Sequence, residues 1–574
     1  MDNQSWFAKF KERKIGQTLA VYIGSAWVFI EVFNFLIDKY NWDTEILDII
    51  ILLVIFGFPA VIIYAWFDQK FTKKAILLQL LNGLVAISLI SYNLINPNTI
   101  NPTQIQLLKF KDNQKKLAEA VRSVVILPFD NYTGDESQDF LVFGMHDALI
   151  SELGQLGAIR VVSKTSSLAF KGSDKTIKEI ASDLKVDAII EASVLSVDEK
   201  NVSIQLKLVS AYPDEQQLWS QTFNSDISNI LDLYNRVIKD IANEIQLALT
   251  PEQQTQLAEK REVNPESYKA YLRGMYNIHQ LTAEGMIKGM EYLQEAIRID
   301  PADPFAYAGL ALGFLEVSHG PFDVGDAYKK AAEAASQAFK LDTTMAEVYS
   351  ALAEVYMYSY WDWNKAEEYY KRAIELNPSY EQPHYHYAWA LYLFGRMEEA
   401  IFEHELARDC DPLNPLYTAL LGGIYGYDGR YEEAIIEANK SLEMQKDYPF
   451  GYWVLGETYM AMGREEDAIE AYEKLAEVAP WFNWPLGYAY AVTGHLSEAE
   501  EILNELENLN VTTWNALGRA AVSGALGKRD EAFKWLDFEP HHVWIPWVAV
   551  MPFWKPLYED PRYDEFVQNL NLPK

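Results

Sequence analysis

Cysteine is nearly absent from this chain of 574 residues, since Cys410 is the only one. A single thiol cannot form an intramolecular disulfide, so the fold does without one in whichever compartment the protein lies. Familiar catalytic motifs are absent too, because the sequence contains no Walker A motif, G-x-G-x-x-G, H-E-x-x-H or G-x-S-x-G. We therefore expect no enzymatic activity and no bound cofactor.

Histidine is also scarce, with nine residues in the whole chain. Three of them share one segment (His384, His386 and His404), and two are adjacent (His541 and His542). A metal site needs ligands that converge and partners that orient them, and no cysteine joins either group. The sequence therefore predicts no metal site.

Basic residues are few outside the first fifth of the chain. Lys and Arg number 49 against 82 Asp and Glu, which gives a net charge of −33. Residues 1–111 hold ten basic and eight acidic residues, so the excess of negative charge belongs to the remainder. Such an acidic surface repels nucleic acid and mainly confers solubility. We expect no nucleic-acid partner.

Three long, mostly apolar segments lie in the first hundred residues, at about 15–37, 46–67 and 75–96. Each has 22 or 23 residues, which as a helix is enough to cross a hydrocarbon core of about 30 Å. A cleaved signal peptide would have a shorter apolar core and an A-x-A-like exit, and neither is present. The sequence therefore predicts three transmembrane helices and an integral membrane protein.

Basic residues around these segments predict their orientation. The residues that matter are Lys9, Lys11, Arg13 and Lys14 before the first segment, and Lys70, Lys73 and Lys74 between the second and third. Because Lys and Arg accumulate on the cytoplasmic side, both flanks should face the cytoplasm. Three crossings then place everything after about residue 96 outside.

The composition changes after a polar linker at 97–119. Over residues 120–250, β-branched runs such as SVVILPF and NVSIQLKLVSAY alternate with helical patterns such as DFLVFGMHDALISELGQL. Two of the strand patterns flank a turn at Asp198–Lys200 and indicate a hairpin. We expect a small α/β domain with a mixed sheet and its helices on one face.

A short sequence word recurs in the C-terminal half, as FGRMEEAI, YDGRYEEAI and MGREEDAI. Its glycines, Gly395, Gly429 and Gly463, are 34 residues apart, and alanines follow the same period. A 34-residue period with small residues in both helices and a terminal proline is typical of the tetratricopeptide repeat, a helix-turn-helix unit. The pattern predicts an all-α solenoid of about eight repeats over 251–544 and a C-terminal cap over 545–574.

The stretch SVVILPFDNYTGDESQDFLVFGMHDALISELGQLGAIRVVSKTSSLAFKG, with VDAIIEASV and LWSQTFNSDISNIL, resembles the TolB/FlgO-like domain that precedes such repeats in bacterial envelope and signalling proteins. The segment FKERKIGQTLAVYIGSAWVFIEV is similar to one branch of that family. Other branches carry a nucleotide cyclase, a protein kinase or a winged-helix domain where this chain has its three spans. His146 departs from the family pattern, which more often has a small hydroxyl residue there, and we interpret it as a half-exposed helix residue.

Stacked repeats leave a concave groove that is lined by the first helix of each unit. The repeat template places seven residues on that face: Tyr385, Trp389, Trp453, Glu457, Trp481, Trp484 and Tyr488. Aromatic side chains of this kind are typical anchors of protein interfaces. We expect Trp453, Trp484 and Tyr488 to form an aromatic strip that faces a bound chain. The alternative, that these residues pack between helices, stays open.

Together these features favour a membrane-tethered, non-catalytic scaffold whose groove binds a protein or peptide. The resemblance implies the bacterial inner membrane, with a cytoplasmic N-terminus and a periplasmic remainder after about residue 96. A second hypothesis is a sensor or regulatory subunit for a separately encoded cyclase or transcriptional regulator. A third is an enzyme whose site has no recognisable motif.

Overall fold

The computed structural model describes residue 62 and residues 121–573, with gaps at 198–199, 248, 259–261, 281, 320–325, 510–512 and 539–542. The predicted transmembrane helices and the linker at 97–119 lie outside these residues, apart from Ile62. Within the described part, no helix is both long and apolar enough to cross a membrane. The chain divides into two units, Met1–Asp112 and Asn113–Lys574, and nearly all described residues belong to the second.

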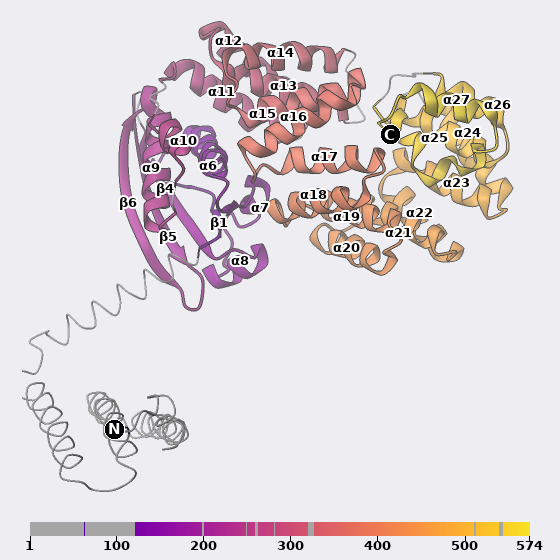
Figure 1. Ribbon diagram of the computed structural model, residues 1–574, viewed down its shortest axis with the longest axis horizontal. Coiled ribbons are helices and arrows are strands. Elements are labelled where there is room, and N and C mark those ends of the chain that lie inside the picture. Colours follow the sequence, from indigo (N-terminus) through magenta and orange to yellow (C-terminus); the bar gives the residue numbers. More distant parts are fainter. Residues whose placement is uncertain are drawn as a thin grey trace, which may run out of the picture. The chain divides into compact units, whose positions relative to one another are not determined.

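The α/β domain is built on a mixed sheet, whose strands Figure 1 shows beside one another. The central path runs β3-β1-β4-β5-β6, and β2 pairs with β4. Pairing is parallel for β1 with β3 and β4, and antiparallel for β4 with β5 and β5 with β6. The strands are β1 (Ser123–Ile126), β2 (Asp130–Asn131), β3 (Arg160–Val161), β4 (Ala188–Val197), β5 (Asn201–Ser210) and β6 (Gln216–Asp226). The mixed sheet and its hairpin confirm the prediction.

Helices cover both faces of this sheet, so the prediction of helices on one face was wrong. The helices are α6 (Asp139–Gly154), α7 (Lys164–Leu168), α8 (Ile177–Leu184), α9 (Ile230–Glu244) and α10 (Pro251–Gln256). Val124 and Ile126 of β1 pack with α6 and α9, whereas Val125 between them packs with α8. Every residue of β1 is buried, as is usual for a parallel strand that is covered on both sides.

Helices α11 to α26 form eight antiparallel pairs within the described residues, and consecutive pairs stack on one another (Figure 1). The pairs are α11 (Pro265–Ile278) with α12 (Ala283–Ile299), α13 (Pro304–His319) with α14 (Ala327–Leu341), α15 (Ala346–Val355) with α16 (Trp363–Leu376), α17 (Glu381–Leu393) with α18 (Met397–Cys410), α19 (Pro415–Tyr427) with α20 (Tyr431–Met444), α21 (Pro449–Ala461) with α22 (Glu465–Val478), α23 (Trp484–Val492) with α24 (Leu496–Asn508) and α25 (Thr513–Ala525) with α26 (Arg529–Leu536). Alanines at the 34-residue period are fully buried where the two helices of a pair meet, at Ala366, Ala400, Ala434 and Ala468.

The recurring sequence word forms the turn inside three of the pairs, α17 with α18, α19 with α20 and α21 with α22. Gly429 has a φ of 82°, in the left-handed region that glycine adopts without strain. The next residue, Arg430, donates its backbone N–H to the carbonyl of Tyr425 at 2.9 Å, which ends the first helix. The Arg430 side chain then donates to Glu433 in the first turn of the second helix, at 2.6 Å from Nε. Glycine, arginine and an acidic residue three positions later, Glu433 here and Asp467 in the next pair, are therefore repeated because together they close one helix and start the next.

The third repeat departs from this turn. Its helices α15 and α16 start 17 residues apart, at Ala346 and Trp363, whereas α17 and α18 start 16 apart, at Glu381 and Met397. The extra residue is taken up by a π-helical turn, η3 (Tyr356–Tyr360), at the end of α15. Such turns widen a helix locally and are frequent at functional sites.

Candidate functional site

The predicted groove residues lie on first helices in six of seven cases. Tyr385 and Trp389 lie on α17, Trp453 and Glu457 on α21, and Trp484 and Tyr488 on α23. Trp481 instead lies in the 3-10 turn η4 (Pro480–Phe482) before α23, and its position on a first helix was wrong. A proline at the start of this turn, Pro480, ends the preceding helix and moves the tryptophan into the connection. Trp481 is 45% exposed, and Tyr385 is half-buried.

The C-terminal segment of the chain covers part of this face. It consists of η5 (Ile545–Ala549), η6 (Pro552–Leu557) and α27 (Pro561–Asn569). Its Phe553 packs edge-on against Trp484 and Tyr488, with ring centroids 4.8 and 4.9 Å apart. The Tyr488 hydroxyl also donates to the carbonyl of Pro552 at 3.3 Å. Trp484 and Tyr488 are thus covered by the C-terminal segment of the same chain and not by a separate partner.

This segment reaches well beyond the last repeat. The Tyr392 hydroxyl on α17 donates to the carbonyl of Val550 at 3.1 Å. Further back, Trp547 stacks on Tyr358 of the π-helical turn, with centroids 5.7 Å apart. The sequence analysis missed these contacts, although the run WIPWVAVMPFWKPL is more apolar and aromatic than a cap that touches one repeat would need. That excess of aromatic residues was the available signal.

In the predicted strip of Trp453, Trp484 and Tyr488, the ring of Phe482 lies between the two tryptophans, with its centroid 5.9 Å from that of Trp484, and it also contacts Trp453. The Trp453 ring packs against Phe482 and Phe450, at centroid distances of 5.7 and 6.0 Å, and only 5% of the residue is exposed. Trp389 is similarly buried, with ring centroids 5.9 Å from Tyr392 of the same helix and 6.5 Å from His404 of α18. These indoles fill spaces between helices, which is the alternative that the sequence left open.

Glu457 is a buried carboxyl on the same face. It is 8% exposed, and its Oε2 accepts a hydrogen bond from the Tyr427 hydroxyl at 2.8 Å. Burial raises the pKa of Glu457 to about 8, although the hydrogen bond from Tyr427 lowers it. A pKa of about 8 favours the neutral carboxyl at pH 7, so this buried group adds little negative charge to the face.

The loop that follows α18 joins the repeats to the α/β domain. Asp411 in this loop is 1% exposed and accepts hydrogen bonds from the hydroxyls of Ser163 and Ser166 and from the Ser166 N–H. The Ser163 N–H donates to the carbonyl of Cys410 at 2.8 Å. These serines begin α7, so the carboxylate caps that helix from another domain. The two domains are therefore held together by hydrogen bonds that no sequence motif predicted.

A second contact between the domains is a charge cluster. Lys164 of α7 lies 2.8 Å from the Asp147 carboxylate of α6, and His279 at the end of α11 lies 3.6 Å from it. Burial would raise the pKa of Asp147, but Lys164 and His279 outweigh it and hold the pKa well below its usual value. Asp147 therefore stays ionised, and the cluster acts as an electrostatic contact between the domains.

The histidines that the structure describes are separate structural groups, and His541 and His542 lie outside the described residues. His146 is 1% exposed, so the prediction of a half-exposed position was wrong. Its Nε2 lies 2.9 Å from the carbonyl oxygen of Ile126 in β1. Burial lowers the pKa of His146 to about 4. His384 contacts Glu403, and His404 contacts the carbonyl of Tyr417. Across the described residues no three potential ligands converge on a metal position.

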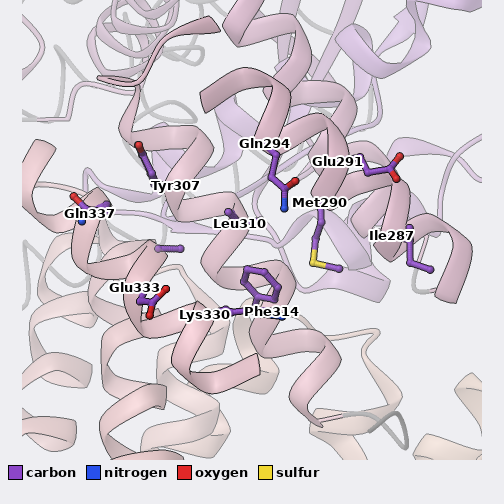
Figure 2. A pocket seen from close by; sticks show the side chains of 11 residues that line it. Ile287, Met290, Glu291, Gln294, Tyr307, Leu310, Phe314, Lys330, Glu333 and Gln337 are labelled. Atoms are coloured by element: carbon purple, nitrogen blue, oxygen red, sulfur yellow. The ribbon is translucent and has the colours of Figure 1, made fainter. Parts of the chain in front are cut away.

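A pocket of about 720 Å³ lies between helices of the first two repeats (Figure 2). Its floor comes from Met290, Leu310, Phe314 and Tyr307, with Ala334 beside them. Its rim is exposed and consists of Ile287, Glu291, Gln294, Lys330, Glu333 and Gln337. The sequence analysis did not single out these residues, because their spacing is that of any amphipathic helix.

Comparison with protein families identifies the helical repeats. Models described as tetratricopeptide repeat match residues 362–424 and 451–480. Among solved structures, PilW, a type IV pilus biogenesis factor, is 18% identical and covers 47% of this chain and 98% of its own, with a TM-score of 0.29. YrrB, a tetratricopeptide-repeat protein with an unusual peptide-binding site, is 18% identical and covers 33% of this chain and 92% of its own, with a TM-score of 0.26.

Two curated relatives share parts of the sequence. Putative adenylate cyclase 3 of Rhizobium meliloti is 25% identical over 190 residues, 33% of this chain and 32% of its own. The transcriptional regulator HilA of Salmonella typhimurium is 24% identical over 302 residues, 52% of either chain. The chain thus spans a third to a half of the length of these relatives. Taken with the helix pairs, the family matches show that the chain contains tetratricopeptide repeats, a fold that indicates interaction with other proteins.

Proposed function

We propose that the protein is a membrane-tethered, non-catalytic scaffold that binds a protein or peptide partner through its repeats. The observation that carries this proposal is the stack of eight helix pairs with two matches to the tetratricopeptide repeat. Each pair buries one face against its neighbours and leaves another face free for a partner. The α/β domain is hydrogen-bonded to the stack through Asp411, so it would support the repeats and hold them in place.

The membrane tether rests on the sequence. The segments at about 15–37, 46–67 and 75–96 are long and apolar enough to span a bilayer, and their flanking lysines favour a cytoplasmic N-terminus. The scaffold would then present its repeats outside the inner membrane. The resemblance of residues 120–250 to TolB/FlgO-like domains of bacterial envelope proteins agrees with this placement.

The partner would meet a groove that is already partly filled. Trp484 and Tyr488 are engaged by Phe553, and only Tyr385 and Trp481 of the seven predicted groove residues stay partly or largely exposed. A photoreactive amino acid at Trp481, in the full chain in its native membrane, tests the groove. One specific cross-linked protein, absent when the same amino acid replaces the exposed Glu432 of α20, would support the groove. Equal labelling at both positions would argue against it.

A regulatory role is the second candidate, because both curated relatives have names that belong to signalling, a putative adenylate cyclase and a transcriptional regulator. In this role the chain would respond to its ligand by acting on a separately encoded cyclase or regulator. Deletion of the gene should then change cyclic-nucleotide level or transcription in the cell. A scaffold with no such role would change neither, while its cross-linked partner would still be found.

A further inference from the structure

The pocket of the first two repeats is an open trough with two parallel walls. One wall is α12, which contributes Ile287, Met290, Glu291 and Gln294, and the other is α14, which contributes Lys330, Glu333, Ala334 and Gln337. Both sets follow the spacing i, i+3, i+4, i+7, so each wall presents one face of a helix over about two turns. Helix α13 forms the floor, with Leu310 and Phe314.

The trough is apolar inside and wide enough for side chains of another molecule. The trough has a volume of about 720 Å³. Figure 2 shows Met290, Leu310 and Phe314 among the side chains that line it. Ile287 at one end is 59% exposed, an unusual exposure for a large aliphatic side chain beside other apolar groups. Because the rim side chains are exposed, a small molecule would not be enclosed here. A helix laid along the trough would cover the apolar floor on its open side.

The charges on the rim select the occupant. Glu291 and Glu333 line opposite walls, halfway along the trough, and Figure 2 shows the Glu291 carboxylate on the outer side of its wall. Neither makes an ion pair with any residue that the structure describes, whereas the exposed glutamate Glu433 is paired with Arg430. Lys330 lies at one end of the trough, with its Nζ 5.7 Å from the centroid of the Phe314 ring. The middle of the trough therefore keeps the negative charge of the two glutamates. A lysine or arginine on either flank of a bound helix would lie near one of these two rim carboxylates.

We propose that this trough binds a basic amphipathic helix of a partner protein. Apolar side chains at i, i+3 or i+4, and i+7 would contact Met290, Leu310 and Phe314, and basic residues on the two flanks of the helix would lie near Glu291 and Glu333. The net charge of −33 would also favour the encounter with a basic segment. The inference rests on the proposed scaffold function and names its docking site and the class of partner.

Fluorescence anisotropy with the full chain in phosphatidylcholine nanodiscs tests the proposal. The probe is a labelled 14-residue helical peptide with leucines at i, i+3, i+4 and i+7 and lysines elsewhere, and empty nanodiscs give the background. We expect saturable binding, weakened at least about tenfold by Ile287→Asp because a charge enters the apolar trough. The matched control is Ile436→Asp on α20, which replaces another exposed isoleucine and should leave binding within about twofold.

Two further comparisons test the charge. Replacing both carboxylates, Glu291→Gln with Glu333→Gln, should weaken binding about fivefold. Glu432→Gln with Glu443→Gln on α20 removes the same charge elsewhere and should change binding less than twofold. Equal binding of a peptide with glutamates in place of lysines, or equal loss in the two double variants, would overturn the basic helix.

The native partner separates this inference from the scaffold function. If Ile287→Asp abolishes the cross-link of the partner to the repeats and Ile436→Asp does not, the trough is the docking site. If the cross-link survives Ile287→Asp, the scaffold function stands and the trough is excluded.

Discussion

Truncation of Phe553 tests whether the C-terminal segment is a structural part of the repeats. Phe553 is 3% exposed and lies against Trp484 and Tyr488 at centroid distances of 4.8 and 4.9 Å. Removing a buried phenylalanine side chain costs about 3 to 5 kcal/mol of unfolding free energy. Within that total, each edge-on aromatic pair contributes roughly 0.5 to 1.5 kcal/mol. We therefore expect Phe553→Ala to destabilise the repeats by at least about 3 kcal/mol.

A double-mutant cycle isolates the contact itself. Phe553→Ala, Trp484→Ala and the double variant are unfolded with urea in the full chain, and tryptophan fluorescence and circular dichroism are followed together. Because the two rings touch, the cost of the double variant should fall short of the sum by about 1 kcal/mol or more. The matched control is Phe402, an exposed phenylalanine on α18 (58% exposed), whose replacement by Ala should cost less than about 0.5 kcal/mol.

The refuting result is strict additivity of Phe553→Ala and Trp484→Ala with a small cost for each. Trp484 would then be free of the C-terminal segment, and the groove would be open along its whole length. If instead both variants lose stability and keep the cross-linked partner, Trp484 is a packing residue and not a binding anchor.

The remaining predictions concern titration, the domain contact, topology and autonomy. Folding raises the pKa of Glu457 from 4.5 to about 8, so the folded state holds this proton more tightly and the free energy of unfolding should fall as pH rises from about 4.5 to 8. Glu457→Gln should remove that part of the pH dependence of urea unfolding, and an unchanged dependence would contradict the prediction. Asp411→Ala leaves two buried serine hydroxyls without their acceptor and should cost about 2 to 4 kcal/mol with faster hydrogen exchange in α7, whereas Asp411→Asn, which keeps an acceptor oxygen, should cost less. Alkaline phosphatase fused after Lys574 should be active if the repeats are extracytoplasmic, and activity of a cytoplasmic reporter alone would reverse the topology. A fragment of residues 120–574 should be soluble and helix-rich and should unfold cooperatively, and an aggregated fragment would show that the spans are needed for folding.

The sequence by itself determined the local structure of the repeats. Gly429 and Arg430 define a helix end and the next helix start through contacts within a few residues, so their recurrence was enough to predict the turns. The buried alanines followed from the same period. Helix-helix packing within one repeat depends on residues close in sequence, so a short motif is enough to predict it.

The tertiary structure decided everything that joins distant segments. Three features each join residues that are far apart in the sequence: the packing of α8 on the second face of the sheet, the capping of α7 by Asp411 and the contact of Phe553 with Trp484. No periodic pattern encodes such pairs. An aromatic residue looks the same in the sequence whether its side chain contacts a partner protein, a neighbouring helix or the C-terminal segment of the same chain. Trp453, Trp484 and Tyr488 looked alike in the repeat register, and only the path of the C-terminal segment separated the covered pair from the tryptophan that packs between helices.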